Sequence, residues 1–95
     1  MKSAKEQRAA RARTMKTLRT RARIRMSSWS EENKVRVARA EYVLNFYLRG
    51  EDGPGAAVCS LMSDLRHYCD AYRVSYREQN EIADRNYAGQ VLELI

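Results

Sequence analysis

Residues that interrupt helices are scarce in this sequence of 95 residues, which has one proline and four glycines. The proline and three of the glycines fall in one stretch, GEDGPG at 50–55, the densest cluster of turn residues in the chain. Hydrophobic residues outside it recur mostly at intervals of three and four, and no alternation is long enough for a strand. The sequence therefore predicts long helices joined by short connectors.

Metal-binding and redox residues are also scarce, with one histidine and two cysteines. Cys59 and Cys69 fall ten residues apart on one expected helix, about 15 Å along its axis, whereas a disulfide needs Cα atoms within about 7 Å. An internal disulfide is therefore excluded, and both thiols are expected to be reduced. Cys59, His67 and Cys69 do not share a helix face and no CxxC pair exists, so neither a metal nor a cofactor is expected.

Long hydrophobic runs are absent too. No stretch approaches the roughly 18 to 20 apolar residues of a membrane span, and the charged start is not followed by a secretory apolar run. We therefore expect a cytoplasmic protein without a membrane partner. An Arg-rich, acid-poor start is also typical of mitochondrial transit peptides, but its apolar residues are too sparse for a strong membrane face.

Acidic residues are nearly missing from one end of the chain. Residues 1–27 hold ten bases and one acid, Glu6, for a net charge of +9, whereas residues 28–95 hold eight bases and eleven acids, for −3. This asymmetry is typical of a basic arm attached to an ordinary module. We divide the chain accordingly into an arginine-rich arm, 1–27, and a helical module, 28–95.

The arm consists mainly of good helix formers and places arginine at every second position from 19 to 25. On a helix these charges point in all directions, which suits a groove walled by phosphates better than a flat membrane. Arginine also makes bidentate contacts with phosphate. The predicted nucleic-acid-binding residues are Arg8, Arg11, Arg13, Lys16, Arg19, Arg21, Arg23 and Arg25.

The module is predicted to contain three helices. The first is capped by Ser28 or Ser30 and ended by Gly50, the second covers 56–72, and the third covers 76–94 behind Ser75. The second is the most amphipathic and is expected to form the centre of the core. The expected core residues of the first helix are Val35, Ala38, Tyr42, Phe46 and Leu48 or Arg49, with Val43 and Tyr47 widening this face. Those of the second are Val58, Leu61, Met62, Leu65, Tyr68, Cys69 and Tyr72, and those of the third are Ile82, Ala83, Tyr87, Val91 and Leu92 or Ile95. The predicted fold is all-α, with a basic N-terminal helix or arm followed by a compact three-helix module.

The string LMSDLRHYCDAY, residues 61–72, resembles a group of small uncharacterised helical proteins of phages, prophages and bacterial mobile elements. The matching positions are Leu61, Met62, Asp64, Leu65, His67, Tyr68, Asp70 and the later Tyr87. The chain has YRVSY where those proteins typically have a glycine and then a phenylalanine in the connector. The resemblance covers roughly residues 40–90 and implies a fold and a provenance but no activity.

The start of the arm, SAKEQRAARAR at 3–13, is similar to the arginine-rich RNA-binding peptides of lambdoid N-type antitermination proteins. Ala4, Lys5, Arg8, Arg11 and Arg13 match that pattern, whereas Gln7 and Ala12 replace expected arginines. This similarity implies a helix that folds on an RNA hairpin.

Ser60, Asp64 and His67 share one helix face and suggest a catalytic triad. A triad needs its base between the nucleophile and the carboxylate, whereas here the carboxylate lies in the middle and no Gly-rich loop is adjacent. We instead expect an Asp64–His67 hydrogen bond and an Arg66–Asp70 pair, with no catalytic residue and no small-molecule substrate.

The sequence thus favours a non-enzymatic adaptor or regulator of mobile-element origin. Its arm is expected to bind RNA or DNA, and its module a host protein or a second copy of itself. Tyr47, Tyr72 and Tyr76 are the predicted protein-interface residues, because tyrosine is enriched at interfaces. The alternative is a small phage-type inhibitor of a host protein complex, whose arm docks on an acidic protein surface.

Overall fold

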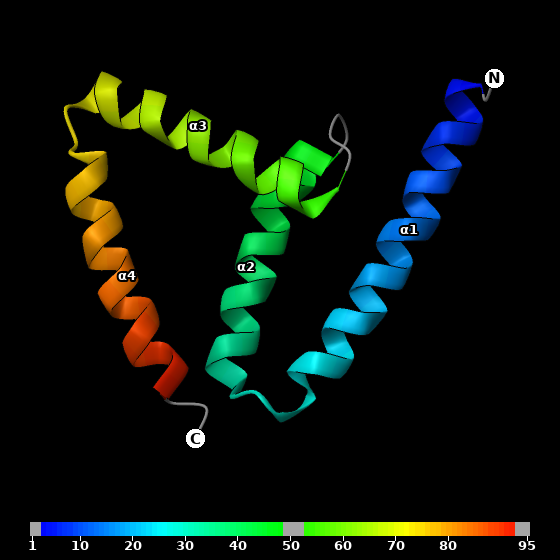
Figure 1. The fold of residues 1–95 in the computed structure, drawn as a ribbon, viewed down its shortest axis with the longest axis horizontal. Coiled ribbons are helices and arrows are strands. Elements are labelled where there is room, and N and C mark those ends of the chain that lie inside the picture. Colours follow the sequence, from blue (N-terminus) through cyan, green and yellow to red (C-terminus); the bar gives the residue numbers. More distant parts are fainter. Residues whose placement is uncertain (1–2, 49–52, 93–95) are drawn as a thin grey trace.

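The computed structural model describes residues 3–48 and 53–92, and within these ranges the chain forms helices and no strand (Figure 1). The elements in chain order are α1 (Ala4–Arg25), the short 3-10 helix η1 (Met26–Ser28), α2 (Glu31–Leu48), α3 (Pro54–Tyr72) and α4 (Tyr76–Leu92). The predicted all-α fold is confirmed, with a basic N-terminal helix followed by three further helices.

Serine side chains begin three of these helices. Ser3, Ser30 and Ser75 each accept a hydrogen bond from the backbone N–H three residues later, at 3.1 to 3.2 Å. Each bond satisfies one N–H that has no partner within the helix. Of the two serines considered for the first module helix, Ser30 is thus the cap and Ser28 is not. Pro54 opens α3, where its missing N–H costs nothing.

The connector between α3 and α4 turns at Arg73, which has the left-handed backbone conformation (φ 55°, ψ 39°). The N–H of Val74 then donates to the carbonyl of Cys69 at 2.9 Å, which closes the end of α3. The predicted helix end at Gly50 and the last residues of the predicted final helix lie outside the described residues.

The helices form an open single layer. The chain extends 46 × 39 × 16 Å, and its thickness is little more than the diameter of one helix, about 10 to 12 Å. In Figure 1, α1 and α2 diverge from η1, α3 crosses the far end of α2, and α4 returns on the other side of α2. The radius of gyration is 16.2 Å, against about 12 Å for a globular chain of this length. The chain as a whole is therefore not compact. Among the described residues of the three-helix module only Asn33, Ala57 and Cys69 are buried, so the module lacks the compact core that the sequence predicted.

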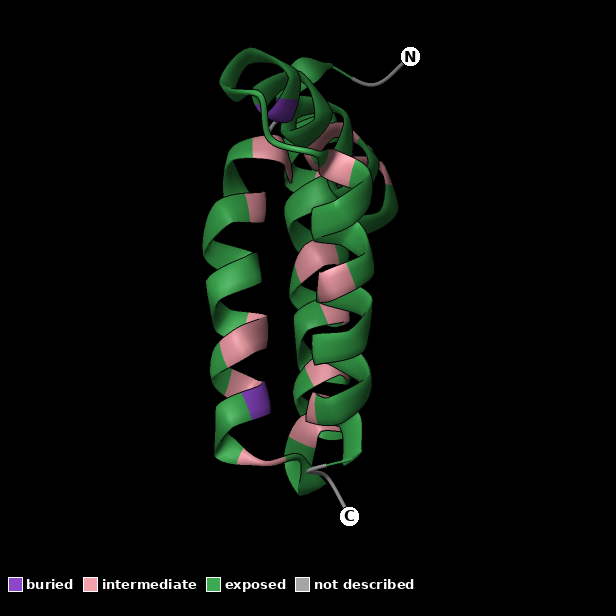
Figure 2. Cartoon of the chain, turned by 90° about the vertical axis from the view of Figure 1, so that its left-hand side faces the viewer, coloured by how far each residue is buried: buried purple, intermediate pink, exposed green. Residues whose placement is uncertain are grey.

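Very little of the predicted core is buried (Figure 2). Among the described residues, only Ala57 and Cys69 are buried apolar residues. Within the described residues α3 packs against α2 mainly near its start and against α4 near its end, and in between the Tyr47–Asp64 hydrogen bond leaves most of the apolar stripe exposed. In α4, Ile82 is half-buried, whereas Ala83, Tyr87 and Val91 are exposed. The predicted core on α3 and α4 is therefore wrong, apart from Cys69 and the partly covered Leu61 and Ile82.

The predicted core face of α2 is also wrong, apart from the half-buried Tyr47 and Leu48. Tyr42 and Phe46 are 72% and 69% exposed and contact each other edge to face, with ring centroids 6.2 Å apart. Val37, Leu44 and Leu48, on nearly the opposite side, are half-buried and face α1. α2 thus carries two apolar stripes, and periodicity alone does not determine which of them meets a neighbour.

Candidate nucleic-acid interface

Helix α1 is stabilised mainly by local interactions. The Ser3 cap begins the helix, Glu6 lies in the first turn, and Arg23 and Arg25 lie in the last. Charges in this order interact favourably with the helix dipole, each contributing about 0.3 to 1 kcal/mol. No α1 residue is fully buried. The helix therefore presents almost its whole circumference to solvent.

The basic side chains of α1 are all exposed. Within the described part of the chain none of them forms an ion pair. The eight predicted binding residues lie on this one helix, together with Lys5. The acids of the module that lie in the described ranges therefore leave the charge of α1 uncompensated.

These charges surround the helix. At 3.6 residues per turn, Arg8, Arg11 and Arg19 lie on the side that faces α2, whereas Arg13 lies on the far side. Lys16 and Arg23 share one flank, and Arg21 and Arg25 lie on the other. A ligand that contacts several of these side chains at once must wrap around α1 or receive it in a groove.

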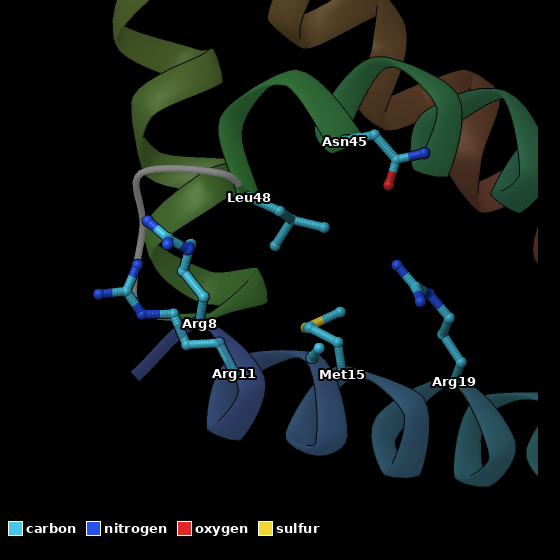
Figure 3. A pocket seen from close by; sticks show the side chains of 7 residues that line it. Arg8, Arg11, Met15, Arg19, Asn45 and Leu48 are labelled. Carbon is cyan, nitrogen blue, oxygen red and sulfur yellow. The ribbon is translucent and has the colours of Figure 1, made fainter. Parts of the chain in front are cut away.

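The inner side of α1 and the end of α2 enclose an open groove of about 640 Å³. Figure 3 shows the side chains of Arg8, Arg11, Met15 and Arg19 from α1 and of Asn45 and Leu48 from α2 pointing into the space between the helices. Ala12 completes the lining as far as the structure describes it, and none of these residues is a carboxylate. Three guanidinium groups therefore line the groove without an anion among the described residues, an arrangement that favours a negatively charged ligand.

A second, more apolar groove of about 190 Å³ shares Met15, Arg19, Asn45 and Leu48 with the first. Its further lining comes from Leu18 and Ala22 of α1, from Val37, Glu41 and Leu44 of α2, and from Pro54 and Ala57 of α3. We call this second groove the α1–α2 groove. Val37 and Leu44 of its α2 wall were missed in the sequence, where the predicted core face of this helix followed the aromatic residues instead.

The three tyrosines predicted at a protein interface do not form one patch. Tyr47 is half-buried at the end of α2, and its hydroxyl donates a 2.8 Å hydrogen bond to Asp64. Tyr72 stacks on Tyr68 at 4.5 Å between ring centroids and is largely exposed. Tyr76, at the start of α4, lies beneath the guanidinium group of Arg66, 5.4 Å from its carbon to the ring centroid. Only the last two flank the same corner, between α3 and α4.

The local pairs expected on α3 are replaced by contacts to neighbouring helices. Asp64 accepts from Tyr47 rather than from His67, and Arg66 lies over Tyr76 rather than beside Asp70. The reason is that aromatic side chains of α2 and α4 reach α3, so the tertiary contacts replace pairs worth only a few tenths of a kcal/mol. The Asp64 carboxylate raises the pKa of Tyr47 above its ordinary value of 10.0, mainly through the hydrogen bond.

The described ranges contain neither a metal-binding group of side chains nor a helix that could cross a membrane. No group of three His, Cys, Asp or Glu side chains within 3–48 and 53–92 is placed to hold a metal ion. Over the same residues, every helix is too short or too polar to cross a membrane.

Comparisons of the chain with protein-family models, curated proteins and solved structures found no match.

Proposed function

We propose that this protein binds nucleic acid through α1 and acts as a non-enzymatic adaptor or regulator. One observation carries the proposal: the basic side chains of α1 are exposed on all sides of the helix and form no ion pair within the described residues. Mutual repulsion of these charges raises the free energy of the unbound helix. Phosphate groups remove that repulsion and release their own counterions, which favours binding.

The arrangement suits a folded or double-helical nucleic acid better than a flat anionic surface. A helix that lies on a membrane has one apolar side, whereas α1 has charge on its inner side, its outer side and both flanks. A nucleic-acid groove has phosphates on both walls, so cations on opposite sides of α1 bind at the same time. The seven arginines of the arm add bidentate contacts that lysine does not make.

The module has the role of a protein-contacting part in this proposal. It exposes many large aromatic and aliphatic side chains on α2, α3 and α4. Exposed apolar surface of this kind is typical of sites that bind other proteins. A mobile-element origin rests on the sequence resemblance of residues 61–72, and the regulatory role is inferred from that origin together with binding.

The test measures the affinity of the full chain for a DNA duplex, an RNA hairpin and a single strand by fluorescence anisotropy over a range of salt concentrations. If five to eight cations engage a duplex, the slope of log affinity against log salt is about −4 to −7. Replacing Arg13, Arg21 and Arg25 by Gln removes three contacts and reduces the slope by about 2.7.

A matched control carries Arg39, Arg77 and Arg85 replaced by Gln, which changes the net charge equally but leaves α1 intact. We expect this variant to retain nearly all of the affinity. Equal losses in both variants would mean that binding follows net charge alone and would contradict a role specific to α1. No retention of any of the three nucleic acids at physiological salt would reject the proposal outright.

The alternative, an inhibitor whose arm docks on an acidic protein surface, makes a different prediction in the same system. Capture of bacterial proteins by the full chain should then persist after nuclease treatment and weaken when the α1 arginines are replaced. Nucleic-acid binding predicts that nuclease removes the captured material.

A further inference from the structure

The chain exposes far more surface than a folded monomer of its mass. Its accessible surface is 8125 Å², whereas a monomer of 11.0 kDa typically exposes about 5,600 Å². The excess is about 2,500 Å² per chain. Obligate homodimers bury about 2,000 to 5,000 Å² in total, or about 1,000 to 2,500 Å² from each chain. One second copy is therefore sufficient to cover the excess.

The α1–α2 groove has the pattern needed to receive such a copy. On α1, Met15, Leu18 and Ala22 are spaced by three and four residues, and on α2, Val37, Leu44 and Leu48 are spaced by seven and four. These are the spacings of the apolar positions in helical bundles. All six side chains are only half-buried within one chain, because α1 and α2 diverge from η1 (Figure 1).

The two walls are also similar in length, with 22 residues in α1 and 18 in α2. A pair of helices that presents apolar stripes on both inner sides is complementary to another such pair. Two pairs facing each other across a twofold axis make a closed, four-helix contact in which every stripe has a partner.

We infer that two copies of this chain form a homodimer in which each α1–α2 groove is filled by the α1–α2 pair of the other copy. This inference rests on the excess accessible surface of the chain and on the spacing of apolar residues along α1 and α2, and it does not depend on the proposed function. The twofold arrangement sets α1 of one copy beside α2 of the other and keeps the two cationic helices diagonal. Glu41, on the α2 wall, then lies within reach of Arg19 from the other copy.

The test is the molar mass of the full chain, measured by sedimentation equilibrium after nuclease treatment in about 0.5 M salt, where exposed charges are screened. The expected mass is twice 11.0 kDa. A mass of one chain at every soluble concentration overturns the inference. A mass that keeps growing with concentration also overturns it, because it indicates an open assembly instead of a closed pair.

Variants of α1 identify the surface. Leu18→Glu places a charge in the groove and should weaken dimerisation by at least about 30-fold. Ile24→Glu makes the same change on the opposite, 68% exposed side of α1 and should leave the mass unchanged. If Ile24→Glu dissociates the dimer equally, the groove is not the interface.

A third variant and one further measurement separate dissociation from unfolding. Leu44→Glu tests the α2 wall and should act like Leu18→Glu. Far-UV circular dichroism is recorded at the concentration of the mass measurement. A helical monomer supports the inference, whereas a groove variant that remains a dimer at every concentration overturns it.

Discussion

The hydroxyl of Tyr47, near the end of α2, donates a 2.8 Å hydrogen bond to a carboxylate oxygen of Asp64, in the middle of α3. Together with Ala57, which has no exposed surface, this bond fixes the crossing of α2 and α3. The same carboxylate raises the pKa of Tyr47. The crossing is therefore sensitive to alkaline pH.

Replacing Tyr47 by Phe should lower the melting temperature at neutral pH, because it removes this hydrogen bond. The raised pKa sets the pH dependence. The stabilisation is complete below the pKa of an unfolded tyrosine, 10.0, and is lost as the pH rises through the higher pKa of the folded state. The difference in melting temperature between the two proteins should therefore shrink above about pH 10.

Thermal unfolding by circular dichroism on both sides of that pH measures the effect. Tyr42→Phe is the control, since Tyr42 is 72% exposed and its ring contact with Phe46 survives the change. Equal stability of Tyr47→Phe and the original protein at neutral pH would contradict the prediction.

Asn33 connects α2 to the end of α4. It is buried, its Nδ2 donates to the backbone carbonyl of Gln90 at 3.0 Å, and its Oδ1 accepts from Arg36. Asn33→Ala should reduce the free energy of unfolding by about 1 to 2 kcal/mol, because it removes the buried donor of that carbonyl. Urea denaturation measures the loss, and hydrogen exchange should show faster opening of residues 87–92.

Asn80→Ala makes the same change at an exposed position of α4. It should alter the free energy of unfolding by less than about 0.5 kcal/mol. If both variants lose the same stability, the Asn33–Gln90 bond does not hold α4 against α2.

Arg73 adopts a left-handed conformation that side chains with a Cβ rarely adopt. Arg73→Gly should therefore stabilise the chain by about 0.5 to 1 kcal/mol, the relief of backbone strain exceeding the added entropy of the unfolded state. Denaturant unfolding provides the measurement. As a control, Arg85→Gly inside α4 should cost about 1 kcal/mol; stabilisation by both variants would refute the strain argument.

Arg13 and Arg21 separate the two proposals, since neither side chain lines the groove between α1 and α2. Replacing both by Gln should reduce the salt slope of nucleic-acid binding by about 1.8 and leave the molar mass unchanged. Anisotropy and sedimentation on the same samples measure both quantities. A change in mass would place one of these two positions within the interface between copies.

Much of the local structure followed from sequence. Ser30 and Ser75 predicted helix starts because their side-chain oxygens accept backbone N–H groups within three residues. Ser3 caps α1 and Pro54 opens α3 for similarly local reasons. The exposure of the α1 cations could also be expected, since ten bases and one acid in residues 1–27 cannot neutralise one another.

Only the tertiary structure decided which apolar stripes are covered. Periodicity identified the stripe on α3 from Val58 to Tyr72 and the one on α2 through Tyr42, but it indicates a side of a helix and not the presence of a neighbour. Burial depends on where other helices lie, and η1 and the α3–α4 corner spread them into one layer. The Tyr47–Asp64 bond and the groove around Leu18 and Leu44 arise from that arrangement, because they join helices whose relative positions no local pattern specifies.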